Sequence, residues 1–87
     1  MELISAVQND DINRVSELLD SGVDPNLSDN DGDRALILAS LFGNIEIVKL
    51  LLEHGVDPNL SDRWGKTPIM IALREGNTET VKLLLEH

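Results

Sequence analysis

The sequence predicts an all-α solenoid in which helix-turn-helix units stack side by side and are joined by turn-rich fingers. The strongest observation is a repeat: residues Gly22–His54 recur as Gly55–His87, with about 20 of the aligned positions identical. A second observation is that each copy carries two apolar segments at helical spacing, separated by a glycine. A fixed period of this size indicates an array in which each unit buries an apolar face against its neighbours.

Residues 1–21 align with the tail of the repeat and form a third, atypical copy. Its second helix is expected at Ile12–Asp20, where the apolar residues share one stripe. Arg14 and Glu17 stand where the next copy has isoleucine and leucine, so one side of this helix is polar, as a terminal unit requires. We therefore predict one domain over residues 1–87, with an N-terminal capping repeat at 1–21, a middle repeat at 22–54 and a third repeat at 55–87.

Each full copy opens with a segment that ends the preceding helix and is itself not expected to be helical. Gly22 and Gly55 follow the preceding helices, where a left-handed residue is common and glycine adopts it freely. The prolines in Val23–Asn26 and its repeat disfavour helix, and Asp31-Gly32 is typical of a tight turn. These segments are the predicted fingers.

The middle copy then predicts two helices. The first covers Arg34–Leu41 and ends at Gly43, and the second covers Ile45–His54, with Asn44 as its N-cap. The second helix is apolar nearly all round, so it must be covered on several sides. A repeat that lies between two others satisfies that condition.

The third copy has the better start for its first helix. Thr67 is expected to cap it, and Pro68 falls at the first helical position, where its missing amide costs nothing. Arg34 occupies the Thr67 position in the middle copy, so we predict that the middle copy's first helix is less well capped. Asn77 repeats Asn44 and is expected to cap in the same way.

The motifs in this copy resemble ankyrin repeats. Gly65–Ala72 is similar to the family's G-x-T-P-L-H-x-A, Gly76-Asn77 to its inter-helix glycine, and Val81–Leu85 to its second helix. The resemblance covers essentially the whole chain and is weakest over the first copy. Ile37 and Met70 replace the family's histidine, so apolar packing is expected where the family pattern implies a hydrogen bond between repeats.

The C-terminal copy is expected to be incompletely capped. Thr78 and Thr80 replace isoleucines of the middle copy, but Val81 and Leu83–Leu85 remain, which leaves an apolar face without a covering repeat. Two explanations stay open. The natural chain continues beyond His87, or this edge meets another molecule, with self-association as one possibility.

Composition narrows the function. The chain has 87 residues, no cysteine and a formal charge of −9, which opposes the phosphate contacts of nucleic-acid binding. No signal peptide is evident and the apolar runs are too short to span a bilayer, so we expect a soluble, cytoplasmic protein without membrane contact. The charge either serves solubility alone or also steers a basic partner.

No residues suggest catalysis, a cofactor or a metal. His54 and His87 are one repeat position occurring twice, and each is expected to be a polar residue near a helix C-terminus. The run Asp29–Asp33 invites comparison with a calcium loop, but Leu27 and Leu38 fall where that loop needs its first and last ligands. We therefore expect a solvated acidic finger and no enzyme.

What remains is recognition of a partner. The ankyrin resemblance implies a concave surface made by the finger tips and the exposed sides of the first helices. The positions that map to it differ between the two copies: Asn30, Asp31, Asp33, Leu41 and Phe42 in the middle copy, and Arg63, Trp64, Lys66, Arg74 and Glu75 in the third.

Aromatic and arginine side chains are frequent anchors of protein interfaces. The competing interpretation is that Trp64 covers the base of its own finger and that Leu41 and Phe42 pack on the neighbouring first helix. The sequence thus predicts a non-enzymatic module for protein–protein interaction, with a structural or self-associating unit as the alternative.

Overall fold

The computed structural model describes residues 2–87 and contains six helices within them. They are α1 (Glu2–Gln8), α2 (Ile12–Asp20), α3 (Ala35–Phe42), α4 (Ile45–Glu53), α5 (Pro68–Glu75) and α6 (Thr78–Leu85). Among the described residues, the only β-type pairing is an isolated bridge between Ser28 and Arg34. The predicted all-helical fold is confirmed.

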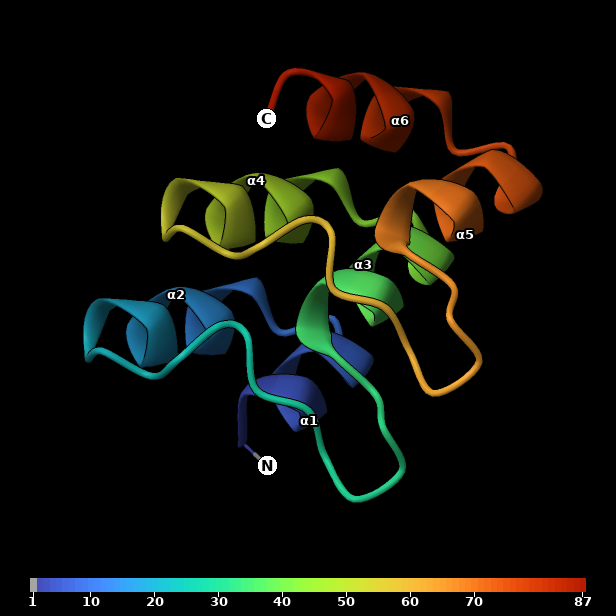
Figure 1. The fold of residues 1–87 in the computed structure, drawn as a ribbon. Helices are drawn as coiled ribbons and strands as arrows, with labels where there is room; N and C mark the ends of the chain where they lie inside the picture. The colour runs from blue at the N-terminus through green and yellow to red at the C-terminus, as the bar shows by residue number, and fades with distance from the viewer. Residues whose placement is uncertain (1) are drawn as a thin grey trace.

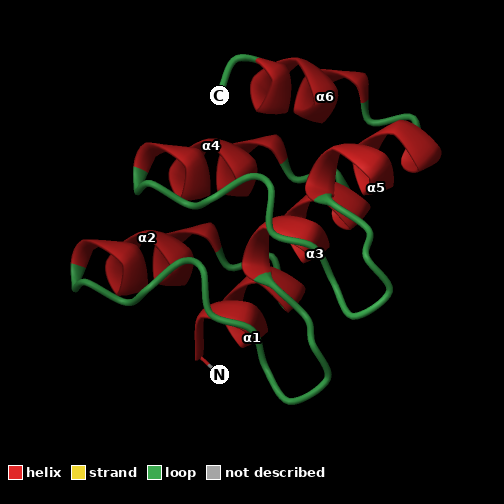
Figure 2. Cartoon of the chain, viewed as in Figure 1, coloured by secondary structure: helices red, strands yellow, loops and turns green. Residues whose placement is uncertain are grey.

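The helices form two rows that run along the stack (Figure 1). One row holds α1, α3 and α5, and the other holds α2, α4 and α6. Each helix packs against its neighbour in the same row and against the other helix of its own unit. The two chain ends lie at opposite ends of the stack, and two loops project from it as fingers (Figure 2). A linear stack of this kind leaves an outward face at each end.

The core runs between the two rows and is centred on the middle repeat. In α3, all residues from Ala35 to Ser40 are buried, and in α4 Ile47, Val48 and Leu51 are completely enclosed. The middle unit is covered on both sides, which is why its helices tolerate apolar residues nearly all round. The predicted burial of α4 is therefore confirmed.

The polar residues of the first unit face outward. Arg14 on α2 is exposed and forms ion pairs with Glu2 at 3.0 Å and with Glu17 at 3.4 Å. These exposed pairs contribute little stability, but they keep this end of the stack hydrophilic. The capping role of residues 1–21 stays a prediction, and its first residue, Met1, lies outside the described residues.

The glycine-based helix ends were predicted correctly. Gly43 ends α3 in the left-handed region with φ 70°, and Gly22 and Gly55 also have positive φ. Asp10 occupies the position of Gly43 in the first unit and takes the same conformation with φ 57°, although it is not glycine. The N-cap Asn44 accepts a hydrogen bond from the amide of Ile47 at 3.1 Å, as expected.

Three expectations about helix starts and packing were wrong. Thr67 lies at the N-cap position, with Pro68 in the first turn, but its hydroxyl makes no capping bond within the described residues. Neither α5 nor α3 therefore has a side-chain cap in this part of the chain. Asn77 is the N-cap of α6 without a capping bond, because its amide is directed to the preceding repeat. Ile37 is buried as predicted, whereas Met70 on α5 is exposed.

None of the helices among residues 2–87 is long and apolar enough to cross a membrane.

Candidate functional site

Each finger is shaped by one aspartate that holds its turn. In the first finger, Asp29 Oδ1 accepts hydrogen bonds from the amides of Asp31 at 3.0 Å and Asp33 at 2.8 Å. Asp62 repeats this arrangement in the second finger. An aspartate that bonds to its own following amides fixes a turn without help from other elements. The two fingers thus share one backbone design and present different side chains.

The tip of the first finger is acidic. The carboxylates of Asp29, Asp31 and Asp33 lie within 4.8 Å of one another. Partial burial and repulsion by the other two carboxylates raise the pKa of Asp33, and the nearby Arg63 only partly opposes this. One oxygen of Asp29 is already engaged by two amides, so this cluster fits an acidic, solvated finger better than a dedicated cation site.

The tip of the second finger combines an aromatic ring with positive charge. The side chain of Trp64 is 70% exposed, and the guanidinium of Arg63 lies 4.8 Å from the centre of its ring. Contact of this kind between a cation and an aromatic face is attractive and restricts both side chains. Lys66 is also exposed in this finger. The structure does not bury Trp64 against the base of its own finger.

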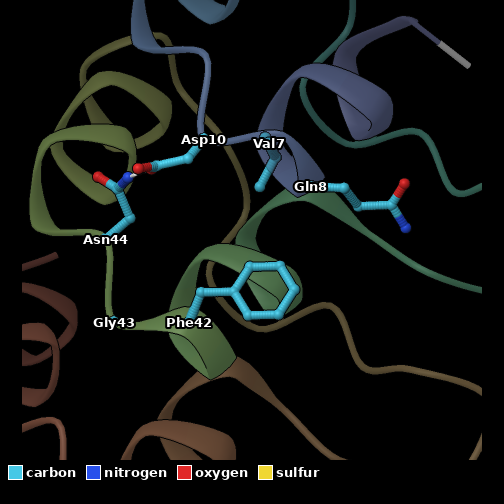
Figure 3. Close-up of a pocket in the computed structure, with 6 residues that line it drawn as sticks. All are labelled: Val7, Gln8, Asp10, Phe42, Gly43 and Asn44. Carbon is cyan, nitrogen blue, oxygen red and sulfur yellow. Dashed lines mark hydrogen bonds between the residues drawn. The ribbon is translucent and has the colours of Figure 1, made fainter.

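The candidate residues on α3 lie near the end of that helix. Leu41 is half-buried, and Phe42 is exposed at the edge of an open hollow of about 460 Å³. Figure 3 shows Val7 and Gln8 of α1 at this hollow and the side chains of Asp10 and Asn44 pointing toward each other, joined by a hydrogen bond. The hollow lies where the first two units meet.

On α5, the candidate residues Arg74 and Glu75 are both exposed. The guanidinium of Arg74 contacts the carboxylate of Glu75 at 3.3 Å. Asn30 and Asp31 are exposed as well, and Asp33 is half-buried. All ten predicted residues thus reach the surface at least in part, but the structure contains no partner, and their role in binding stays a prediction.

Sequence reasoning missed the residue that joins the two fingers. Arg34 donates from Nε to the carbonyl oxygen of Ser61 at 2.8 Å and from Nη1 to that of Asn26 at 2.7 Å. In addition, Asn26 Oδ1 accepts a hydrogen bond from the amide of Asp57 at 2.7 Å. The available signal was that an arginine replaces the threonine of the next copy at this position. These bonds hold the fingers in a fixed relation to each other.

The exposed apolar face at the C-terminal end differs from the expected one. Of the predicted apolar residues only Leu85 is exposed. Leu84 is buried, and Val81 and Leu83 are half-buried. The other large exposed residues here are Met70 and Leu73 on α5, which sequence reasoning did not assign to this face. The available signal was that Leu73 replaces Ser40, its equivalent in the middle copy, and so adds an apolar side chain at this position.

His54 has a structural role near the end of α4. Its Nδ1 lies 2.8 Å from the carbonyl oxygen of Leu50, and its Nε2 lies 3.0 Å from Asp20 Oδ1. The pKa of His54 is raised, mainly by the bond to the carbonyl and to a smaller extent by the bond to Asp20. Both partners are acceptors, so the cationic ring, which has two N–H donors, satisfies both at once.

Comparison with known proteins agrees with this geometry. A sequence model described as ankyrin repeats in three copies matches residues 3–87. The chain is also similar to the crystal structure of an ankyrin repeat domain from Acinetobacter baumannii, with 39% sequence identity and a TM-score of 0.91. That similarity covers 97% of this chain and 45% of the other, so this chain spans less than half of that protein's length.

A comparison with curated proteins found no match. Ankyrin repeats generally act as protein-interaction modules, and the family is typically non-enzymatic. The three-copy match covers nearly the whole sequence, and the stack of paired helices has the same architecture as the solved domain. The chain therefore belongs to the ankyrin repeat family.

Proposed function

We propose that this chain binds a protein or peptide on the concave face formed by its finger tips and first helices. The single observation that carries the proposal is the exposure of Trp64 on a finger whose backbone is fixed by hydrogen bonds. A rigid, exposed aromatic ring loses little entropy on binding and buries a large apolar area, which are the properties of an interface anchor.

The charges on the two fingers give the partner an orientation. The first finger carries Asp31 and Asp33, and the second carries Arg63 and Lys66. A partner with a basic group near the first finger and an acidic group near the second would meet complementary charge at both. Such complementarity sets orientation and association rate more than affinity. The net charge of −9 favours an overall basic partner in the same way.

The test is affinity capture from a lysate of the source organism, followed by mass spectrometry. The native chain is compared with the double variant Trp64→Ser, Phe42→Ser. Leu73→Ser is the matched control, because Leu73 is an exposed apolar residue that is not among the ten residues assigned to the proposed face. Circular dichroism and thermal unfolding establish that all three proteins are folded. The partner is then titrated against each protein by calorimetry.

The proposal expects a protein that the native chain and Leu73→Ser bind with equal affinity and that the double variant binds at least about tenfold more weakly. Equal binding by all three proteins would contradict it. An unfolded double variant would show that Trp64 or Phe42 is structural, and the Trp64→Ser single variant would then separate the two residues.

A second candidate function is structural, and the exposed Met70, Leu73 and Leu85 favour it. In this case the C-terminal edge packs on a further repeat, a further domain or a second copy. Neither candidate requires an enzyme, a cofactor, nucleic acid or a membrane, and we expect the chain to act in the cytoplasm as a scaffold for other proteins.

A further inference from the structure

The hollow between the first two units is bordered by a residue that its backbone conformation does not favour. Asp10 has φ 57°, whereas the equivalent positions of the middle and third repeats hold Gly43 and Gly76, with φ 70° and 72°. Glycine adopts this left-handed conformation freely, and a residue with a Cβ does so at a steric cost. The first unit thus places a carboxylate where the backbone favours glycine.

The structural contact of Asp10 does not require a carboxylate. Asp10 Oδ1 accepts a hydrogen bond from Nδ2 of Asn44. The amide oxygen of an asparagine would accept the same bond, and asparagine also occurs in left-handed positions at helix ends. The negative charge therefore needs another explanation. A carboxylate has two oxygens, so it can hold Asn44 with one and bond to a ligand with the other.

The next interface along the stack is arranged differently at this place. There Nδ2 of Asn77 donates to the carbonyl oxygen of Ser40, and the Asn77 side chain lies against Gly43. The corresponding asparagine of the first interface, Asn44, bonds to the side chain of Asp10, and an open hollow of about 460 Å³ borders this pair. The hollow is thus associated with a departure from the repeat pattern.

The walls of the hollow combine the charge of Asp10 with an aromatic ring. Phe42 is 56% exposed, and the equivalent residues of the other two units are Asn9 and Glu75. Figure 3 shows the Asp10–Asn44 pair on one side of the hollow and the ring of Phe42 on the other. Of the described residues that line the hollow, Asp10 alone carries a charge.

These walls fit a cationic side chain. Lysine and arginine carry their charge on an aliphatic stem, which packs on apolar surface while the head stays in contact with water. A cationic head is attracted both to a carboxylate and to the face of an aromatic ring. An acidic side chain would be repelled by Asp10, and a purely apolar one would remove water from the carboxylate without replacing its hydrogen bonds.

We propose that the hollow between the ends of α1 and α3 binds a lysine or arginine side chain of the protein partner, with the cationic head at Asp10 and the stem against Phe42. This inference rests on the proposed function, because the side chain belongs to the partner that binds the concave face. It adds a contact on the first two units, apart from the finger of the third repeat that carries Trp64. The net charge of −9 attracts such a partner.

The experiment measures the binding of single blocked amino acids, so it requires no partner protein. N-acetyl-arginine N-methylamide and its lysine equivalent are titrated into the isotope-labelled chain and followed by nuclear magnetic resonance, in about 0.1 M salt to screen distant charges. The citrulline equivalent is the neutral control, because a urea group replaces the guanidinium with nearly the same shape. We expect amide shifts centred on Gly43 and Asn44, and at least about threefold weaker binding of the citrulline probe.

Three variants locate the site. Asp10→Asn removes the charge and keeps an acceptor for Asn44, so it should weaken binding of the two cationic probes by at least about threefold. Phe42→Leu should also weaken their binding, because the attraction between cation and ring is lost. Glu53→Gln is the matched control. It removes the same charge from an exposed residue at the far end of α4 and should leave probe binding unchanged. Thermal unfolding establishes that each variant is folded.

The outcomes separate the proposal from general attraction to an acidic protein. Tighter binding of either cationic probe than of citrulline at the hollow supports it, and the preferred probe tells whether a guanidinium or an ammonium is recognised. Equal binding of arginine and citrulline would overturn it, as would an absence of shifts at the hollow. Equal weakening by Asp10→Asn and Glu53→Gln would overturn it as well. If Asp10→Asn does not fold, the comparison of probes on the native chain and Phe42→Leu decides.

Failure of this inference differs from failure of the proposed function. Binding on the concave face is measured with the partner itself and the Trp64 variants. A partner that these variants weaken, together with no preference of the hollow for a cationic probe, would refute the site at Asp10 and leave the proposed function standing.

Discussion

The side chain of Asn77 lies directly against Gly43, close enough that a Cβ on Gly43 would meet its Oδ1 at 3.0 Å. Gly43 ends α3 with φ 70°, and Gly76 ends α5 with φ 72°. The two glycines share one backbone conformation and differ in what surrounds them, since no atom of the described residues lies within 4 Å of the corresponding position at Gly76. They form a matched pair for measuring the contact between repeats.

Gly43→Ala should therefore be more destabilising than Gly76→Ala. Both variants place alanine in the left-handed region, at a cost of about 1–2 kcal/mol. Gly43→Ala should lower the free energy of unfolding by about 1 kcal/mol more, because Asn77 must move and weaken its hydrogen bond to Ser40. Urea denaturation of both variants measures the difference.

The control for this pair is the same comparison in an Asn77→Ala background. With the amide removed, the two glycine substitutions should become equally destabilising. Equal losses in the native background would show that the Asn77 side chain adapts to the added methyl group without cost.

Arg34 is expected to be the main polar connection between the two fingers. Arg34→Thr introduces the residue of the next copy and removes the bonds to Ser61 and Asn26, which should cost about 1–2 kcal/mol. Amide hydrogen exchange in the second finger should become faster. Arg34→Lys should recover at most part of this loss, since an ammonium does not reproduce the guanidinium's divergent N–H donors.

Arg63→Thr is the comparison for Arg34→Thr, because it also replaces a finger arginine. Arg63 is exposed and its guanidinium lies over the ring of Trp64, so its loss should change the free energy of unfolding by less than about 0.5 kcal/mol. Similar effects of the two variants would contradict the role given to Arg34.

The helix positions were predictable because their signals are local. The apolar stripe of Ile12–Asp20 and the glycines that end α3 and α5 are read from neighbouring residues, and the structure places these elements within about a residue of the expected bounds. The repeat then determines how the helices stack, because units of similar sequence pack on their neighbours in the same way.

The bonds between repeats were not predictable in this way. Arg34 reaches Ser61 and Asn77 reaches Ser40, each across a separation close to one repeat length. Thr67 and Asn77 were expected to bond to their own helices, since a lone sequence shows only the nearby amides. For the same reason the exposure of Leu73 was missed, because it depends on whether another repeat lies above it.

The hydroxyl of Thr80 is another feature that the sequence did not predict. Thr80 is completely buried, and within residues 2–87 its Oγ1 has no hydrogen-bond partner. Thr80→Val removes the buried hydroxyl and keeps the branched shape. It should raise the free energy of unfolding by about 1 kcal/mol. Thr78→Val at the exposed start of the same helix should change stability by less than about 0.5 kcal/mol.

Thermal or urea unfolding of the two threonine variants tests this expectation. A stability of Thr80→Val below that of the native chain would mean that the hydroxyl is satisfied, for example by a buried water.

The interaction of His54 with Asp20 makes stability depend on pH. The pKa of His54 is raised above its ordinary value of 6.5 in the folded chain, by the carbonyl of Leu50 first and by Asp20 second. A raised pKa means that the folded state binds the proton more tightly than the unfolded state does. The stabilisation is therefore complete below pH 6.5 and is lost as the pH rises through the folded-state pKa.

His54→Gln should thus be less stable than the native chain at about pH 5.5 and should approach it at about pH 8.5. The difference at low pH should be at most about 1 kcal/mol, because Asp20 is exposed and solvent screens the pair. Asp20→Asn should remove part of the same pH dependence. His87→Gln is the control at the equivalent repeat position, and because His87 is exposed it should change stability by less than about 0.5 kcal/mol. If stability plotted against pH gave parallel curves for His54→Gln and the native chain, the folded and unfolded states would bind this proton with equal affinity.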